Sequence, residues 1–304
     1  MKQPRNQLHG WIVLDKPLGI SSTQALGKVR WLLNADKAGH GGTLDPLASG
    51  VLPLAFGEAT KTVAWAMDGR KTYRFRVKWG FETTTDDLEG EARSSTGLVA
   101  LQHDIEKALP LFIGAVQQKP PSYSAIKVSG ERAYDLARAG EVVDLAARTV
   151  NIESLHIENH DPAGETTFIV QCGKGTYVRS IARDLGRVLG CLGHVTLLRR
   201  LAVGPFSEKD AISLEMLEEL RHRGLSENSL SGILRPIETV LDGIPALAVM
   251  DPEAARLKQG QRVLLEEGQG PSEAEAVLVT HFGKPLGLFK IENRVLKTLR
   301  QFNL

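Results

Sequence analysis

The sequence contains little cysteine. Cys172 and Cys191 are the two cysteines in 304 residues, and neither lies in a CxxC pair or beside a cluster of histidines. Zinc sites and disulfide frameworks need several closely spaced ligands or paired cysteines, so the sequence indicates neither. We expect two buried thiols and no metal site.

Long apolar runs and nucleotide-binding motifs are also missing. No apolar segment approaches the roughly twenty residues that span a bilayer, and the first residues lack the apolar stretch of a secretion signal. The turn CGKGTY lacks the GxxxxGK[ST] spacing of a P-loop, and the chain contains no GxGxxG. We therefore expect a cytoplasmic protein without a membrane partner.

The chain is long enough for one large domain and one small one, and its 42% hydrophobic content suits a well-packed core. After about residue 247 the residue pattern changes to short β-rich runs, EAVLVTHF and PLGLFKIE, which are separated by a turn at Gly283. We predict a large domain over residues 1–247 and a small all-β domain over residues 248–304.

The net charge of +1 hides an uneven distribution of charge along the chain. Residues 1–80 carry 12 basic and 5 acidic side chains, and residues 171–210 carry 7 and 3, whereas residues 81–170 carry 7 and 15. If the fold brings the two basic blocks together, they form a positive face for a phosphate backbone, with the acidic segment turned elsewhere. The alternative is that these are ordinary solvated charges.

The stretch Gly39–Gly57, GHGGTLDPLASGVLPLAFG, contains five glycines and a single acid, Asp45. Glycine permits close backbone approach and positive φ, and Pro46 biases Asp45 away from the helical region, so a tight loop holds the carboxylate. Such an acid is a candidate nucleophile or general base. The alternative is a turn that closes a loop and does no chemistry. The following VLPLAF predicts a short buried strand.

The segment KTYRFRVKWG alternates strictly between two faces. Tyr73, Phe75, Val77 and Trp79 point one way, and Arg74 and Arg76 belong to the other, basic face. Such a strand suits an RNA surface, but it equally describes a sheet strand with one buried and one solvated side.

Further elements are predicted by periodicity and by capping. We expect a strand at WIVLDK ended by Pro17, and a helix capped by Ser21 or Ser22. Past the Gly-Lys-Gly turn we expect a helix whose apolar residues recur at helical spacing. These residues are Ile181, Leu185, Val188 and Leu189.

Six phrases together resemble the TruB family of pseudouridine synthases over nearly the whole chain. They are GWIVLDKPLGISS, GHGGTLDPLASGVLPLAFGEATK, KTYRF, PPSYSAIKVSGERAYDLAR, CGKGTYVRS and GHVTLLRRLAVGPF. The C-terminal RLKQGQRV and its strands are similar to a PUA domain. The chain departs from the family at Gly41 and Ser49, where threonine is common.

The resemblance implies an α+β fold: a mixed, mostly antiparallel sheet flanked by helices, followed by a small all-β PUA-like barrel. It also implies isomerisation of uridine to pseudouridine at position 55, in the T loop of elongator tRNAs, with no cofactor because nothing is added or oxidised. The implied partner is tRNA, through its T-arm stem-loop and acceptor end, and we expect a monomer with no obligatory protein partner.

The resemblance also implies the catalytic residues. Asp45 matches the catalytic aspartate, and Arg179 matches the arginine that pairs with it and keeps a carboxylate ionised when a base covers it. Tyr73 matches the tyrosine that stacks on the extruded base. Tyr177 and Leu198 complete the pocket wall, with core packing as the alternative for both.

Other matched positions imply support and RNA contacts. Lys16 shapes the pocket floor. His40 matches a residue that inserts into the RNA where the target nucleotide has left, although a loop histidine is often a local hydrogen-bond partner. The candidate phosphate contacts are Arg74, Arg76, Arg199 and Arg200.

Two other functions stay open from the sequence. One is a non-catalytic RNA-binding or RNA-folding protein that uses the same surface. The other is the related catalytic subunit of a guide-RNA particle, which often carries a long basic tail, whereas this sequence finishes at QFNL.

Overall fold

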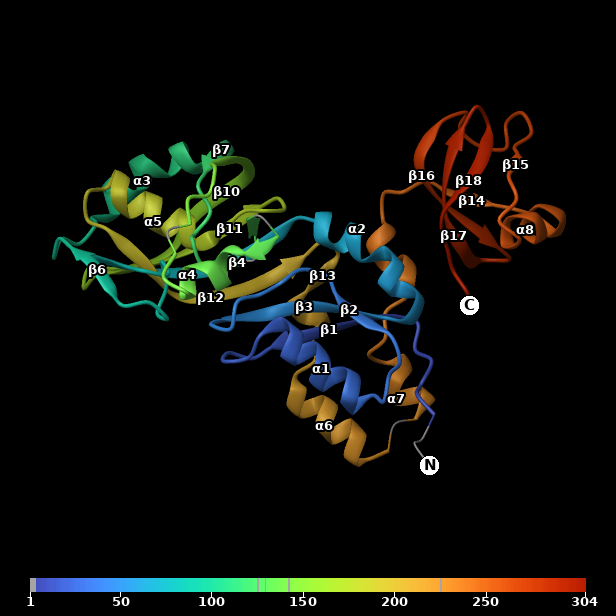
Figure 1. The fold of residues 1–304 in the computed structure, drawn as a ribbon, viewed down its shortest axis with the longest axis horizontal. Helices are drawn as coiled ribbons and strands as arrows, with labels where there is room; N and C mark the ends of the chain where they lie inside the picture. The colour runs from blue at the N-terminus through green and yellow to red at the C-terminus, as the bar shows by residue number, and fades with distance from the viewer. Residues whose placement is uncertain (1–3, 125, 129, 142, 225) are drawn as a thin grey trace.

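The protein is described here by a computed structural model that covers residues 4–124, 126–128, 130–141, 143–224 and 226–304. Ala125 and Ser129 of the phrase PPSYSAIKVSGERAYDLAR lie outside the described residues. The larger part of the chain is built on a nine-stranded sheet, and the C-terminal part on a five-stranded sheet (Figure 1). Among the described residues, no helix is long and apolar enough to cross a membrane.

The large sheet has the strand order β1-β3-β12-β4-β11-β10-β7, with β2 paired to β3 and β13 to β12. Among the strand pairs of this sheet in the described ranges, β12 with β3 is parallel and the others are antiparallel. The predicted mixed, mostly antiparallel sheet is therefore confirmed. Its strands are β1 Gly10–Lys16, β2 Ala38–His40, β3 Ala48–Phe56, β4 Lys71–Trp79, β7 Gly114–Gln118, β10 Arg148–Asp161, β11 Glu165–Cys172, β12 Gly193–Val203 and β13 Phe206–Ser207.

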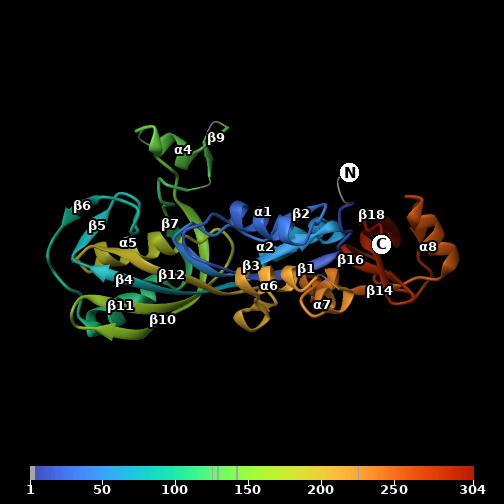
Figure 2. The same cartoon turned by 90° about the horizontal axis from the view of Figure 1, so that it is seen from below.

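Helices cover the sheet in two groups (Figures 1 and 2). One core packs α5 against β4, β10 and β11, and a second packs α1 and α6 against β1 and β3. Two short strand pairs, β5 with β6 and β8 with β9, lie outside the sheet. The remaining elements before the C-terminal sheet are α1 Ser22–Leu32, η1 Gly57–Thr62, α2 Val63–Asp68, β5 Phe81–Thr83, β6 Ala92–Ser95, α3 Gln102–Ala108, η2 Leu109–Phe112, β8 Lys127–Val128, β9 Glu131–Arg132, α4 Ala133–Arg138, α5 Val178–Val188, η3 Glu208–Asp210, α6 Leu214–His222, α7 Glu227–Ser231 and η4 Ile237–Leu241.

Local sequence explains where the elements near the pocket begin. Ser21 is the N-cap of α1 in a reciprocal capping box with Gln24. Ser22 instead faces inward, where its hydroxyl accepts from the backbone N–H of Leu44 at 2.7 Å. In α5 the predicted inward residues Ile181 and Leu185 are buried, but Val188 is 54% exposed because the helix ends there, past the edge of the core.

The C-terminal sheet has the order β14-β16-β17-β18-β15 and encloses its own apolar core. Its first strand crosses the boundary predicted at 247/248, because Ala246 already pairs with Leu278. It also packs on the larger part of the chain: Leu288 and Phe302 share a core cluster with Trp11. Its elements are β14 Ala246–Ala248, α8 Asp251–Lys258, β15 Val263–Leu264, β16 Ala274–His281, β17 Lys284–Glu292 and β18 Val295–Gln301.

Gly50 is required where β3 and β12 run side by side. Its φ is +100°, and a Cβ built there would lie 2.2 Å from the carbonyl oxygen of Arg200. We expect Gly50→Ala to lower the free energy of unfolding by about 2–3 kcal/mol, measured by chemical denaturation, since both backbone strain and a clash are introduced. The control Gly27→Ala, in α1 with no atom within 4 Å of the new methyl, should be neutral or stabilising. Equal stability of the two variants would contradict this account of Gly50.

Candidate active site

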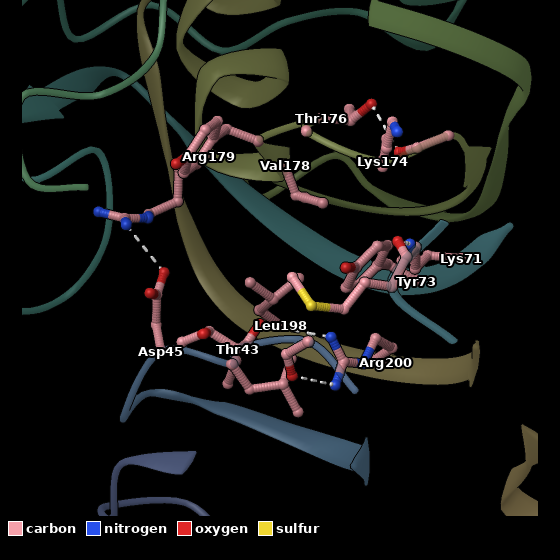
Figure 3. Close-up of a pocket in the computed structure, with 17 residues that line it drawn as sticks. Thr43, Asp45, Lys71, Tyr73, Lys174, Thr176, Val178, Arg179, Leu198 and Arg200 are labelled. Carbon is pink, nitrogen blue, oxygen red and sulfur yellow. Dashed lines mark hydrogen bonds and ion pairs between the residues drawn. The ribbon is translucent and has the colours of Figure 1, made fainter. Parts of the chain in front are cut away.

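A cavity of about 290 Å³ opens beside the centre of the large sheet. It is lined by the loop that carries Asp45, by β4, by β12 and by the turn that leads into α5 (Figure 3). Four segments that are distant in sequence therefore meet there. The volume suits a single nucleoside rather than a polymer strand.

The loop before β3 holds Asp45 at the edge of this cavity. The carbonyl of Asp45 accepts from the N–H of Ala48 at 3.0 Å, which closes a turn around Pro46. The carbonyl of Pro46 accepts from Gly19, so this turn is also tied to the segment after β1. The Asp45 side chain is 42% exposed and points into the cavity. The tight loop predicted from the glycines is thus present.

Arg179, in the first turn of α5, faces Asp45 across the cavity. Its Nη2 lies 2.8 Å from Oδ2 of Asp45, and its Nη1 lies 3.5 Å from Oδ2 of Asp87. The guanidinium also donates to the carbonyls of Thr85 and Tyr123, both at 2.9 Å. With a side chain only 6% exposed, Arg179 is fixed between two carboxylates and two carbonyls. The structure thus brings together the predicted aspartate and arginine.

The acidic segment is not turned away from the second basic block, contrary to the expectation from charge. Residues 82–87 pack against α5, whose arginines recur at every fourth position. Arg183 lies 3.1 Å from Asp86, and Arg187 lies 2.6 Å from Glu82. Burial raises the pKa of Asp86 to about 6, although the neighbouring arginines oppose this. The buried arginines of this helix need acidic partners, and the acidic segment therefore packs against α5.

Three predicted residues line the cavity as expected. Tyr73 of β4 and Leu198 of β12 are half-buried in its wall. Burial raises the pKa of Tyr73, and the Arg200 guanidinium close to its hydroxyl opposes that rise. Tyr177 is the N-cap of α5, and the Gln118 side chain both accepts from its N–H and donates to its carbonyl. Gln118 therefore fixes the start of the helix that carries Arg179.

Lys16 lies at the end of β1 and is fully buried. Its Nζ donates to the carbonyls of Pro17 and Ile20, at 2.8 and 2.7 Å, so it closes the turn on which the Asp45 loop rests. Burial lowers the pKa of Lys16 to about 8, while the charge of Asp45 raises it. Lys16 supports the floor from below and does not line the cavity itself.

The depressed pKa of Lys16 predicts a dependence of stability on pH. Between about pH 8 and the ordinary value of 10.5, the unfolded chain binds the Lys16 proton more tightly than the folded chain does. Stability therefore rises with pH in this window. We expect the free energy of unfolding of the wild type, minus that of Lys16→Met, to increase by about 1–2 kcal/mol from pH 8 to 9.5 in urea denaturation. The exposed Lys28 supplies the control Lys28→Met, and a pH-independent difference for Lys16→Met would contradict the prediction.

His40, the last residue of β2, lies partly buried near Arg200. Its Nδ1 is buried and has no hydrogen-bond partner among the described residues. Burial, and then the charge of Arg200, lower its pKa. The lowered pKa favours the neutral form of the ring. Nδ1 does not make the local hydrogen bond that was the alternative role for this histidine.

Arg74, Arg76 and Arg199, the candidate phosphate contacts, do not line the cavity. Side chains alternate along a strand, and β4 and β12 present Tyr73 and Arg200 to the cavity, so these three arginines lie on the opposite face. There each is paired with carboxylates. The pairs are Arg74 with Glu158, Arg76 with Glu165, and Arg199 with Asp15 and Glu208. The carboxylates offset the positive charge of these three arginines.

Arg200 also differs from expectation because it is 1% exposed. Its guanidinium donates to the carbonyls of Val51, Gly42 and Thr43, at 2.8, 3.1 and 3.3 Å. It therefore ties the loop before Asp45 to β3 and lines the cavity, rather than forming an exposed basic surface.

The sequence interpretation did not assign Lys71, Lys174 or Asp87 to the site. Lys71 and Lys174 line the cavity, and Asp87 pairs with Arg179. One available indication was that Lys71 precedes Tyr73 by two residues and so shares its strand face. Among the described residues no group of three or more His, Cys, Asp or Glu side chains could hold a metal ion. The absence of a cofactor stays a prediction.

Solved structures with a similar fold were found by comparison of the whole chain. A chain in the crystal structure of the archaeal box H/ACA sRNP Nop10–Cbf5 complex matches 98% of this chain and 87% of its own length, with a TM-score of 0.73 and 23% identity. A chain in the structure of an H/ACA RNP bound to a substrate RNA containing 2′-deoxyuridine matches with a TM-score of 0.74 at 23% identity, over 97% of this chain and 86% of that one. This chain therefore shares the fold of those two chains.

Sequence comparison gives the family. Residues 30–178 match the family described as TruB family pseudouridylate synthase (N terminal domain), and residues 179–242 match the tRNA pseudouridylate synthase B C-terminal domain. The tRNA pseudouridine synthases B of Nitrobacter winogradskyi and Rhodopseudomonas palustris are each 52% identical over 304 residues, covering all of this chain and 85% and 83% of those proteins. The chain belongs to the TruB family of pseudouridylate synthases. It is an isomerase that converts uridine to pseudouridine, and the resemblance inferred from the sequence is confirmed.

Proposed function

We propose that this enzyme forms pseudouridine at position 55, in the T loop of elongator tRNAs, and that Asp45 is its nucleophile. The Asp45 carboxylate, 2.8 Å from the buried Arg179 inside a nucleoside-sized cavity, is the observation that carries the proposal. The relatives that are 52% identical are named as tRNA pseudouridine synthases, which supports tRNA as the substrate. We further propose that the enzyme acts in the cytoplasm as a monomer, without cofactor or protein partner.

The chemistry requires a carboxylate that stays ionised beneath a bound base. The C1′–N1 bond breaks, the base turns, C1′ joins C5, and the proton on C5 is exchanged for one on N1. Arg179 lies against the Asp45 carboxylate and stabilises its negative charge, since a fixed cation offsets the loss of water around it. Asp87 and two carbonyls hold that guanidinium in place, so it is oriented before the substrate arrives.

The walls of the cavity suit an extruded base. Tyr73 offers a ring on which the uracil stacks, and Leu198 and Tyr177 exclude water on the other sides. Stacking restores part of the few kcal/mol that the base loses on leaving the RNA stack. We propose that His40, whose Nδ1 has no hydrogen-bond partner among the described residues, enters the space that the nucleotide vacates.

The C-terminal sheet gives a second contact. We propose that this PUA-like domain, residues 248–304, grips the acceptor end of the tRNA through its shape and backbone. Its contact with the catalytic part includes Lys61, whose Nζ donates to the carbonyl of Gln301 at 2.6 Å.

The test uses the purified chain alone with an unmodified tRNA transcript, and pseudouridine is mapped by chemical labelling and primer extension. We expect one pseudouridine, at position 55, and none in a transcript with cytidine at that position. Modification that appears only when a guide RNA or protein partner is added would refute the proposal in favour of a guided particle. Tight binding without any pseudouridine would favour the RNA-binding alternative.

A further inference from the structure

Two buried cations, Lys71 and Arg200, lie at the side of the cavity away from Asp45 (Figure 3). Their exposures are 7% and 1%. Lys71 is on β4 two residues before Tyr73, and Arg200 is paired with Tyr73 across the strands. The cavity thus has the Asp45–Arg179 ion pair at one side and two buried cations at the other.

Neither cation has a carboxylate partner. Within the part of the chain that the structure describes, no carboxylate oxygen lies within 4 Å of Lys71 or Arg200. Lys71 donates to the carbonyl of Met67, and Arg200 donates to the three carbonyls described above. The other cations of the cavity differ, because Arg179 meets two acids and the exposed Lys174 lies 2.8 Å from Asp68.

A buried cation that meets only carbonyl dipoles is costly in the empty pocket. The cost is offset when the bound molecule supplies negative charge to the same place, and a charge fixed in advance stabilises a transition state most effectively. One ammonium hydrogen of Lys71 is used by Met67, so two remain for a ligand. The geometry of the site therefore calls for an oxygen that gains negative charge beside Lys71.

Uracil has such an oxygen. O2 is carried by C2, the ring atom next to N1, whereas O4 lies on the far side of the ring from C1′. With C1′ beside Asp45, O4 is directed toward Lys71. When the C1′–N1 bond breaks, its electron pair stays on the ring and is shared between N1, O2 and, through C6, C5 and C4, O4. If the carboxylate instead adds to C6, the displaced pair again reaches O4. Both routes increase the negative charge on O4.

We propose that Lys71 is a further catalytic residue, which donates a hydrogen bond to O4 of the target uracil and stabilises the negative charge that the ring gains as its bond to C1′ breaks. Arg200 adds a second positive charge behind it and positions Tyr73 and the Asp45 loop. The inference rests on the proposed roles of Asp45 and Tyr73. It also accounts for selection of uracil, since cytosine would present an amino group to a cation.

The charge state of Lys71 agrees with this role. Burial and the neighbouring Arg200 lower its pKa to about 8, so the ammonium form predominates at neutral pH. The other groups that act on Lys71 are Lys174, which lowers the pKa, and Cys172 and Asp68, which raise it. The pKa of Lys71 is therefore close to neutral pH, which is where a proton donor to an oxygen anion acts most effectively.

The experiment is a double-mutant cycle between Lys71 and the substrate. Single-turnover rates are measured for the wild type and Lys71→Met, on tRNA with uridine, 4-thiouridine or 2-thiouridine at position 55, with tRNA affinity measured in parallel. We expect Lys71→Met to be about 100-fold slower with uridine at unchanged affinity. We expect 4-thiouridine to slow the wild type but not the variant, and 2-thiouridine to slow both equally. Lys28→Met, which removes an exposed lysine that does not line the cavity, should stay within about threefold of the wild type.

Several results would overturn the inference. A Lys71→Met rate within threefold of the wild type would do so, as would 4-thiouridine slowing both enzymes by the same factor. If Lys71→Met melts well below the wild type, the cycle is run with Lys71→Arg, which keeps the charge but moves the donor, and additive effects there also overturn it. Failure of the proposed function is distinguishable, because the wild type would then leave position 55 of the uridine-containing tRNA unmodified.

Discussion

Asp45→Asn is expected to abolish pseudouridine formation, with a loss on the order of 10⁴-fold or more in the single-turnover rate. The amide keeps the shape of the carboxylate but supplies neither a nucleophile nor a negative charge. Because the Asp45 loop is held by backbone contacts to Ala48 and Gly19, the variant should fold normally. Release of tritium from C5-labelled uridine in tRNA measures the reaction, and filter binding measures affinity, which should change by less than about threefold.

Asp15 supplies a matched control for this substitution. It is an aspartate on the face of the sheet away from the cavity, paired with Arg199 at 2.9 Å. Asp15→Asn should therefore retain activity within about threefold, since an exposed ion pair contributes little to stability. Tritium release by Asp45→Asn at a rate similar to that of Asp15→Asn would rule out the nucleophile role.

Arg179→Met is expected to lower both activity and stability. The single-turnover rate should fall by about 10³-fold, because Asp45 loses the cation that stabilises its negative charge under the base. The free energy of unfolding should fall by about 3–5 kcal/mol, because Asp87, whose side chain is 8% exposed, is left without its partner. Urea denaturation and tritium release measure the two effects on the same preparation.

The double variant Arg179→Met/Asp87→Asn separates these two effects. Removing both charges leaves no buried unpaired carboxylate, so stability should recover by about 1–3 kcal/mol relative to Arg179→Met. Activity should not recover, since Asp45 still has no cation. A double variant that regains the activity would show that Arg179 acts through folding alone.

The elements around the site were predictable because their residues act locally. Strand alternation identified β4, the N-cap serine identified the start of α1, and glycines with Pro46 identified the loop that holds Asp45. The pairing of Asp45 with Arg179 did not follow from spacing; it was inferred from resemblance to the family. The reported distance of 2.8 Å is consistent with it.

Two features could not be predicted from the sequence: which face of a strand lines the cavity, and which acids lie beside the arginines of α5. Alternation showed that Arg74 and Arg76 share a side of their strand, but not that this side is turned away from the cavity toward Glu158 and Glu165. Charge counts suggested that acids avoid the basic blocks, whereas α5 buries Arg179 and Arg183, which need acids beside them. Lys71 was overlooked because a lysine in a strand usually points to solvent, and only the tertiary fold buries it.

The parallel pairing of β12 with β3 has a consequence for biosynthesis. Strand β12 begins at Gly193, whereas the loop that carries Asp45 is complete before Phe56. A ribosome must therefore make most of the polypeptide before the central strand can insert and before the arginine can reach its acid, and such distant pairings form slowly. Until then, Asp45 in the nascent chain lacks its arginine partner. Modification can begin only once the chain through Val203, the end of β12, has left the exit tunnel.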